Sequence, residues 1–250
     1  MLKISTSNSE IIADNLPAEY KVLDVGGSSA PFQRADFIID VLPYSKIQWS
    51  QKRGASDRRL IEKNYVQHDI CSREPWPFDD KQFDYVFCSH VLEDIRDPIW
   101  VCSELIRVSK AGYIEIPSKL FETTFGLEAK GLAGATHHRW VIDVHNQKLR
   151  FTFKFFHIHY PFINNNRQHL NQDNNAMLLR IEWENDFEYF ENWLLSGKDI
   201  FEYFLDKPIS ENEKWNIYRK LSPKNYFSAW LRYLKNTSEI FNKIYLRIKR

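Results

Sequence analysis

The chain of 250 residues contains only three cysteines, eight glycines and no long apolar run. Cys71, Cys88 and Cys102 form no CxxC pair and are odd in number, which argues against a disulfide framework and against a structural zinc site. No stretch approaches the ~18 consecutive apolar residues that a membrane-spanning helix needs. Residues 1–10 also lack the apolar core of a signal peptide. We therefore expect a cytoplasmic protein that does not cross a membrane.

The chain also lacks a strong overall charge. Its 34 basic and 33 acidic side chains leave a formal net charge of +1, which argues against a general nucleic-acid binder, because such a protein needs a clustered basic surface. The charge is nevertheless uneven. Residues 214–250 hold ten basic residues against one acid, Glu239, so this segment carries +9 and residues 1–213 carry −8. The C-terminal segment is thus electrostatically distinct.

Short β-branched runs alternate with helical stretches in the first half of the chain. This alternation favours an α/β fold with a doubly wound, mostly parallel sheet. Helices are predicted at 11–16 and 97–108, where Asp97 can cap the second helix and Pro98 suits its first turn. Only about ten residues separate the first two strands, so the crossover between them must be unusually short. The predicted strands are 22–25, 37–41, 66–69, 85–88 and 113–116.

The pattern changes to period-two alternation from residue 136 onward. Residues 141–144 and 149–155 predict a β-hairpin that turns near 145–148 and is inserted at about 136–160. A second alternating run, 178–189, has Asn185 and Asp186 at its middle as a turn signal. The Asn-rich stretch 164–175 is predicted to be a loop. Residues 1–190 therefore form the predicted domain, and 191–250 form a helical, basic, aromatic-rich extension.

Glycines and carboxylates follow the predicted strands. The segment KVLDVGG ends at Gly27, and Asp40 and Asp69 come at the ends of the next two strands. Glycines allow a ligand to approach the backbone, and ligands of parallel sheets bind at the carboxyl ends of the strands. An acid after the second strand can accept from both ribose hydroxyls, and one after the third can accept from the amine of adenine. The structural alternative for each acid is an N-cap or an Asx-turn. The first loop lacks the GxGxxG spacing, which disfavours a dinucleotide.

The segment FDYVFCSHVLEDIRDPIWVCSELIRVSKAGYIEIPS, residues 83–118, resembles the core of class I S-adenosylmethionine-dependent methyltransferases. More narrowly, it is similar to small bacterial enzymes often found with surface-polysaccharide biosynthesis. The resemblance runs from about residue 21 to 118, and a weaker similarity continues in HHRW at 137–140. It implies a Rossmann-like fold, S-adenosylmethionine as cofactor and S-adenosylhomocysteine as product. Two departures are Asp94, where the family often has histidine, and a missing third glycine in the first loop.

The resemblance also implies a set of cofactor contacts. Asp24, Gly26 and Gly27 would face the methionine part, and Asp40, with Val41 beside it, would bind the ribose. Asp69 and Ile70 would hold the adenine, while Ser89 and His90 would line the cavity beside the sulfonium.

A base would add about 100- to 10,000-fold if the acceptor is a hydroxyl. The candidates are histidines beyond the cofactor core, namely His137, His138 and His145 around the hairpin and the pair His157 and His159. His137 or His138 is favoured, because both follow the fifth strand and could fold over the methyl group. The alternative is that one packs on a tryptophan and the other is solvated. Glu115 is a further candidate, or a structural acid. His157 and His159 share one face of the predicted strand but have no clear third ligand, so no metal is expected.

The predicted function is O-methylation of a sugar or other small acceptor in polysaccharide biosynthesis. The alternative is a non-catalytic, methyltransferase-like scaffold; an NAD-dependent oxidoreductase is disfavoured because the pyrophosphate loop is missing. The basic tail 214–250 is predicted either to pack on the domain or on a second subunit, as in a homodimer, or to lie on the inner face of an anionic membrane. No nucleic-acid partner is expected.

Overall fold

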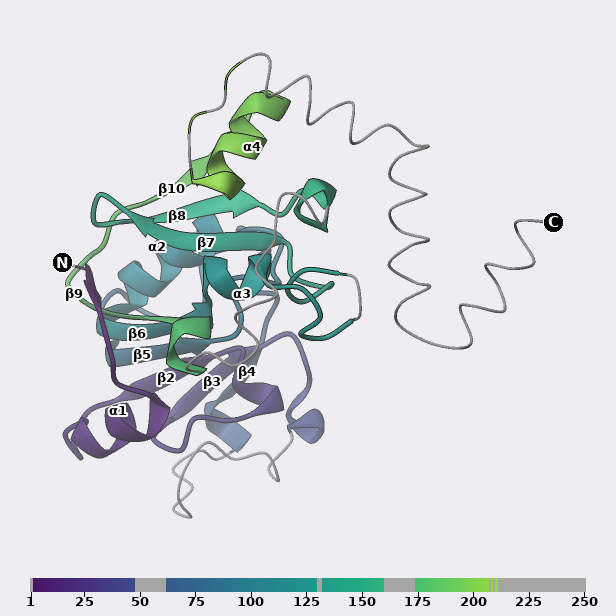
Figure 1. Ribbon diagram of the computed structural model, residues 1–250. Helices are drawn as coiled ribbons and strands as arrows, with labels where there is room; N and C mark the ends of the chain where they lie inside the picture. The colour runs from purple at the N-terminus through teal and green to yellow at the C-terminus, as the bar shows by residue number, and fades with distance from the viewer. Residues whose placement is uncertain are drawn as a thin grey trace. The chain divides into compact units, whose positions relative to one another are not determined.

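The computed structural model describes residues 2–47, 62–129, 132–159 and 174–206, together with 208 and 210 (Figure 1). The chain divides into two compact units, one of residues 1–156 and 166–193 and the other of residues 157–165 and 194–250. Both sheets lie in the first unit. No helix in the described part of the chain is long and apolar enough to span a membrane.

The central sheet has seven strands in the order β1-β9-β6-β5-β2-β3-β4. The five strands from β6 to β4 are mutually parallel, whereas β9 runs antiparallel to β6 and β1 runs antiparallel to β9. This arrangement confirms the predicted doubly wound, mostly parallel, Rossmann-like sheet. The strands are β1 (Leu2–Ile4), β2 (Val22–Val25), β3 (Phe37–Asp40), β4 (Tyr65–Gln67), β5 (Phe83–Ser89), β6 (Ser109–Pro117) and β9 (Leu178–Glu184).

A second sheet of three strands has the order β10-β8-β7. The antiparallel strands β7 (Trp140–His145) and β8 (Lys148–Phe153) confirm the predicted hairpin. Its turn contains Asn146 and Gln147, which both have positive φ. Strand β10 (Tyr189–Asn192) pairs parallel with β8. The alternating run at 178–189 does turn at Asn185, but its two arms belong to different sheets.

One expectation about the hairpin is wrong. After β8 ends at Phe153, residues Phe156–His159 form a 3-10 helix, so His157 and His159 do not share a strand face. The strand ends where the Lys154 ammonium turns inward and donates to the carbonyl of Ala135. Of the predicted C-terminal extension, the structure describes one helix, α4 (Gly197–Leu205), which begins with a capping box of Ser196 and Asp199. The basic segment 214–250 and the Asn-rich residues 164–173 lie outside the described residues.

Among the described residues of the first unit, the α-helices are α1 (Ser9–Asn15), α2 (Pro98–Val108) and α3 (Lys119–Thr123). The Asp97 carboxylate accepts from the backbone N–H of Trp100 and Pro98 occupies the first turn of α2, as predicted. Buried Val101, Leu105 and Val108 lie on the face of α2 that joins the larger apolar core. This apolar stripe at helical spacing is why the segment folds as a helix against the sheet.

The crossover between β2 and β3 contains only a short 3-10 helix, Gly27–Ser29. In place of a full helix, Phe32 covers the sheet and stacks on Phe87, with ring centroids 3.9 Å apart. Phe87 in turn stacks on Tyr113 at 5.3 Å. The predicted short crossover is therefore confirmed, and an aromatic stack supplies the burial that a helix normally provides.

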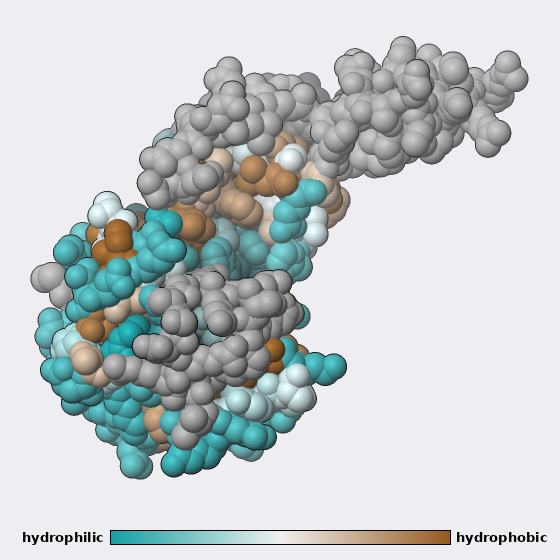
Figure 2. All heavy atoms as spheres, turned by 90° about the horizontal axis from the view of Figure 1, so that it is seen from below, coloured by the Kyte–Doolittle hydropathy of each residue, from teal (hydrophilic) through white to brown (hydrophobic). Residues whose placement is uncertain are grey.

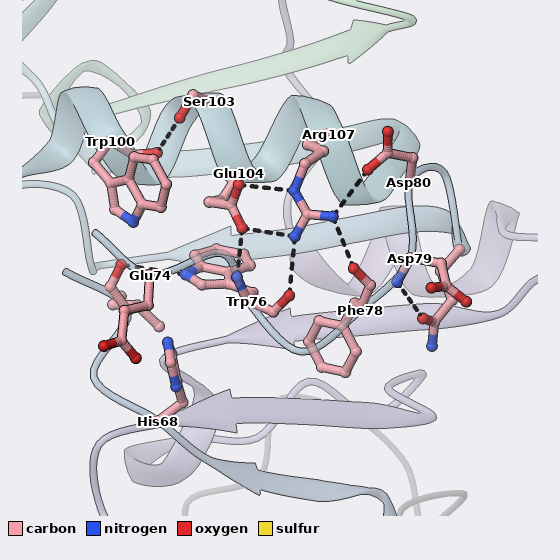
Figure 3. Close-up of polar contacts among 12 residues, drawn as sticks. His68, Glu74, Trp76, Phe78, Asp79, Asp80, Trp100, Ser103, Glu104 and Arg107 are labelled. Carbon is pink, nitrogen blue, oxygen red and sulfur yellow. Dashed lines mark hydrogen bonds and ion pairs between the residues drawn. The ribbon is translucent and has the colours of Figure 1, made fainter. Parts of the chain in front are cut away.

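A polar network fixes the segment between β4 and β5 onto α2 (Figure 3). The Arg107 guanidinium donates to the carbonyls of Trp76 and Phe78 and to the carboxylate of Glu104. Glu104 also accepts from the backbone N–H of Trp76 at 2.6 Å. The indole of Trp76 then donates to the carbonyl of Ile70 at 3.2 Å. The network thereby anchors the loop after β4, which forms one wall of the site described below.

The described surface in Figure 2 is mostly hydrophilic, with apolar side chains in separate patches. Two of the exposed large apolar residues, Val41 and Leu42, directly follow β3. Exposed apolar side chains after a parallel strand are informative, because that is where ligands bind in this type of sheet.

Candidate active site

A cavity of about 550 Å³ opens where β2, β3, β4 and β5 end. Its volume lies in the range typical of small-molecule sites. The structure brings together six of the predicted cofactor residues there: Gly26, Asp40, Val41, Asp69, Ile70 and His90. The sequence did not single out Leu42, Cys71, Val91, Ile95 or Arg96 as lining residues.

The loop after β2 is built closely around its two glycines. Gly26 has φ 72°, and a Cβ there would lie 2.6 Å from a methyl carbon of Val91. A Cβ on Gly27 would lie 1.9 Å from Oδ2 of Asp24. Asp24 is buried beneath the loop and accepts from the backbone N–H of Phe32 at 2.8 Å. Asp24 is absent from the cavity lining, so in this structure it holds the short crossover in place.

Asp40 ends β3 and borders the cavity. Its Oδ2 accepts from the backbone N–H of Ser28 at 3.1 Å, and its Oδ1 accepts from that of Leu42 at 2.9 Å. Each carboxylate oxygen has two lone pairs, so both can accept a second hydrogen bond. Val41, with 61% of its surface exposed, follows immediately. An oriented carboxylate next to an apolar surface suits the ribose and base of a nucleoside.

Asp69 lies in the loop after β4. Its Oδ1 accepts from the backbone N–H of Cys71 at 2.9 Å, and its Oδ2 accepts from the Arg96 guanidinium at 2.8 Å. The Cys71 N–H, followed by Arg96, lowers the pKa of the Asp69 carboxyl despite partial burial. Arg96 also donates to the Cys71 carbonyl at 2.8 Å. No sequence pattern signals this arginine, because the contact joins the loops after two different strands.

His90 follows β5 and adopts φ 56°, a left-handed conformation that is uncommon outside glycine. Its backbone N–H donates to the carbonyl of Glu115 at 2.8 Å. Its Nδ1 lies 3.2 Å from Oε1 of Glu93, and its ring lines the cavity. The preceding Ser89 donates from Oγ to Oε1 of Glu115 at 3.2 Å, so it lies next to the cavity without being part of its lining.

Glu115, a candidate base, lies near the end of β6 within a satisfied polar network. Its Oε2 accepts from Arg180 at 2.8 Å and from the hydroxyl of Tyr113 at 2.9 Å. Although burial raises its pKa, the hydrogen bonds from Arg180 and Tyr113 outweigh burial, and the net shift is downward. These contacts favour a structural, ionised Glu115.

His137 and His138 come together with Asp94 at the edge of the cavity. Nε2 of His137 lies 3.9 Å from Oδ1 of Asp94, and Nε2 of His138 lies 3.8 Å from the same oxygen. Asp94 and the neighbouring Arg139 both line the cavity. The side chain of His137 is 60% exposed and that of His138 only 7%. The structure therefore joins these predicted histidines to the cavity through an aspartate that the sequence marked only as a departure.

Buried Glu122 of α3 holds His138 in place. Its Oε1 lies 2.5 Å from Nδ1 of His138, and its Oε2 accepts from the buried ammonium of Lys154. Burial lowers the pKa of His138, but the hydrogen bond to Glu122 more than compensates, so the net shift is upward. Glu122 of α3 thus fixes the orientation of the His138 imidazole, and Lys154, which directly follows β8, holds Glu122 in turn.

The chain matches a family model described as a methyltransferase domain over residues 37–114. The matched segment begins at β3, ends within β6 and includes Asp40, Asp69 and His90. No curated protein sequence matches the chain significantly.

Among solved structures, the S-adenosylmethionine-dependent methyltransferase of Mesorhizobium loti is 14% identical, with a TM-score of 0.34 over 59% of this chain and 65% of that one. The methyltransferase of Aquifex aeolicus is 20% identical, with a TM-score of 0.29 over 40% and 57%. Phosphoethanolamine N-methyltransferase 2 of Haemonchus contortus, in complex with S-adenosylmethionine, is 18% identical, with a TM-score of 0.33 over 43% and 26%. The match covers less than two thirds of each of these three structures.

Proposed function

We propose that this chain, which has the fold of a class I methyltransferase and a methyltransferase-domain segment, transfers a methyl group from S-adenosylmethionine to a hydroxyl of a sugar or other small acceptor. The observation that carries the proposal is the cavity at the strand ends, where Asp40 and Asp69 lie in one lining with Gly26. S-adenosylmethionine is the cofactor, and S-adenosylhomocysteine is the product.

The cofactor's parts fit different stretches of the lining. The methionine part approaches the backbone at Gly26, where a side chain would collide with Val91. The ribose hydroxyls donate to Asp40, whose carboxylate is already oriented by two backbone N–H groups. The adenine lies between Val41 and the loop at Asp69 and Ile70, where the Asp69 carboxylate accepts from its amine. These carboxylates need little reorganisation when the cofactor binds.

Methyl transfer from a sulfonium is an in-line displacement, so alignment and exclusion of water account for much of the rate. A hydroxyl acceptor must also lose a proton. We assign that step to the cluster of Asp94, His137 and His138, because Asp94 lines the cavity and contacts both histidines. Glu115 is a poorer base, because Arg180 and Tyr113 occupy its carboxylate.

Arg139 suggests the chemistry of the acceptor. Arg139 lines the cavity. It directly follows His138 in the sequence and precedes β7, the first strand of the hairpin. A guanidinium binds phosphate or carboxylate with two parallel hydrogen bonds. We therefore favour an anionic acceptor, such as a nucleotide-linked or lipid-linked sugar, in polysaccharide biosynthesis. Whether the tail 214–250 adds a membrane contact or a dimer interface remains a prediction.

Calorimetric titration with S-adenosylmethionine and S-adenosylhomocysteine, with NAD as a control, tests the donor site. We expect binding of the first two ligands at about micromolar Kd, the common range for enzyme ligands. Asp40→Asn should weaken binding about 10- to 100-fold, because it removes a charged acceptor of two hydrogen bonds. The matched control is Asp14→Asn, which changes an exposed acid of α1 outside the cavity.

An acceptor screen by mass spectrometry then tests transfer, starting with nucleotide-linked and lipid-linked sugars. We expect a methylated sugar in the presence of the donor, and a slower reaction for Arg139→Gln through a higher KM for the acceptor. If neither S-adenosylmethionine nor S-adenosylhomocysteine binds, the chain is a methyltransferase-like scaffold.

A further inference from the structure

We propose that Asp94, His137 and His138 form a binding site for a divalent metal cation at the edge of the donor cavity. The ligand set of two imidazoles and one carboxylate suits a borderline cation such as Zn²⁺, Fe²⁺, Co²⁺ or Ni²⁺. The sequence pattern predicts no metal, because its candidate pair, His157 and His159, has no clear third ligand. The structure places this pair in a 3-10 helix.

The three ligand atoms already have the spacing of an open metal site. One atom from each residue lies within 4.8 Å of the other two. The two distances from Oδ1 of Asp94, 3.9 Å to His137 and 3.8 Å to His138, are too long for hydrogen bonds. Bonds of about 2.1 Å in a tetrahedral site place neighbouring ligands about 3.4 Å apart. Small side-chain movements therefore complete the site without a change of backbone.

Asp94 supplies the second observation. Although 40% of its side chain is exposed, its Oδ1 is buried and accepts no hydrogen bond within the described part of the chain. A buried polar atom without a partner is rare and demands a physical reason. Two imidazole nitrogens face this oxygen from beyond hydrogen-bond distance. A cation between the three groups would satisfy the carboxylate and both nitrogen lone pairs together.

Both histidines have a carboxylate on the far side of the ring. Nδ1 of His138 lies 2.5 Å from Oε1 of Glu122, and Nδ1 of His137 lies 3.8 Å from Oε2 of Glu128. For His138, the hydrogen bond to Glu122 keeps the proton on Nδ1 and leaves Nε2 as the free ligand, which is the usual second shell of a metal-bound histidine. For His137, the distance to Glu128 is too long for a hydrogen bond, so Glu128 only places a negative charge beside Nδ1. The Nε2 atoms of His137 and His138 lie 3.9 Å and 3.8 Å from Oδ1 of Asp94.

The cluster also has a closed and an open side. His138 and Glu122 are buried, whereas His137 and Glu128 are largely exposed. The exposed side gives the cation a route of entry. Three protein ligands leave at least one coordination position open, as in catalytic metal sites.

The role of the cation in the reaction rests on the proposed function, whereas the site itself does not. An acceptor hydroxyl that occupies the open position loses its proton more readily, because a bound cation stabilises the alkoxide. The O–H proton leaves to water, the alkoxide oxygen forms a bond to the methyl carbon, and the sulfur–methyl bond breaks to give S-adenosylhomocysteine. In this arrangement the histidines bind the cation and do not act as free bases.

Titration of the full, tag-free chain with Co²⁺ tests the site by calorimetry and visible absorption. We expect one equivalent to bind and to produce the intense d–d bands of a low-coordinate Co²⁺ complex, and Zn²⁺ to displace it. His137→Ala and Asp94→Asn should each weaken binding at least about 10-fold, as loss of even an outer-shell partner does. His145→Ala is the matched control, because His145 is an exposed histidine of the hairpin outside the cluster.

Circular dichroism of each variant establishes that it is folded; His137→Ala is the decisive variant because its side chain is exposed. Failure of the wild-type chain to bind Co²⁺ or Zn²⁺ overturns the inference, as does equal binding by wild type, His137→Ala and Asp94→Asn. The titration with S-adenosylmethionine is run on the same samples. Donor binding without metal binding would retain the proposed function with a free imidazole as base, and metal binding without donor binding would retain only the cation site.

Discussion

The two sides of the cavity differ in how their carboxylates are satisfied. On the side where we propose that the methyl donor binds, here called the donor side, Asp40 and Asp69 line the cavity and Asp24 lies beneath the glycine loop. Each of these aspartates accepts a hydrogen bond from a backbone N–H of a loop at this end of the sheet. Toward the two histidines, Oδ1 of Asp94, which lines the cavity, and Oε2 of Glu93 are buried and accept no hydrogen bond from the residues that the structure describes. The donor side is therefore satisfied by the protein's own hydrogen bonds, whereas the other side holds carboxylate oxygens without a hydrogen-bond partner among the described residues.

This difference separates two roles of the carboxylates around the cavity. An acid that accepts from backbone N–H groups stabilises the loop and is oriented before any ligand arrives. An acid without such partners lowers stability slightly, since its desolvation is not repaid. The first arrangement suits a cofactor that always binds in one pose, and the second suits a site that is completed during the reaction. Variants that disturb each side should therefore behave differently.

The largest effect should come from the glycine loop on the donor side. Gly26→Ala combines a left-handed φ with a Cβ placed 2.6 Å from Val91, and we expect a loss of about 3 kcal/mol in the free energy of unfolding. Gly126→Ala is the control, because Gly126 has φ 80° but no atom within 4 Å of the added Cβ; its cost should be about 1 kcal/mol. Urea unfolding measures both. Equal losses would mean that the contact with Val91 is irrelevant.

A pair of aspartate variants tests the comparison directly. Asp24→Asn disturbs a buried acceptor that holds the N–H of Phe32, and should lower the free energy of unfolding by about 2 kcal/mol. Asp94→Asn removes a charge whose Oδ1 accepts no hydrogen bond among the described residues, and should change stability by less than about 0.5 kcal/mol in metal-free buffer. Urea unfolding with a chelator present is the measurement. A larger loss for Asp94→Asn than for Asp24→Asn would reverse the distinction between the two sides.

The smallest effect concerns the ion pair of Arg96 and Asp69. The lowered pKa of Asp69 means that its contribution to stability is present above its unfolded pKa and is lost as the pH falls through the folded pKa. Arg96→Gln should raise this pKa only in part, since the N–H of Cys71 is its larger cause. We expect a stability change below about 1 kcal/mol, because the pair is exposed.

Carbon-13 NMR titration of the Asp69 carboxyl provides the measurement for this variant. Arg73→Gln, which removes a similarly exposed ion pair with Asp97, is the control and should leave the pKa of Asp69 unchanged. Return of the Asp69 pKa to its ordinary value in Arg96→Gln would show that the arginine, and not the backbone, orients this carboxylate.

Much of the main sheet could be predicted because its signals are local. Each β-branched run forms a strand, Asp97 caps α2, and the hairpin turns at Asn146 and Gln147. Strand β1 was not predicted, because three residues carry too little periodicity. The separation of β9 and β10 into two sheets was not predicted either, because the alternation of apolar residues indicates which face of a strand is buried but not which strand it pairs with.

The sequence by itself determined that Asp40 and Asp69 lie at one edge of the sheet, because parallel strands bring their carboxyl ends to the same edge. It also determined that the crossover after β2 is short. The tertiary structure alone decided that Asp24 supports the loop, that Arg96 pairs with Asp69, and that Asp94 meets His137 and His138. These contacts join segments distant in the chain, and their geometry depends on how α3 and the hairpin pack beside the sheet, which no local pattern encodes.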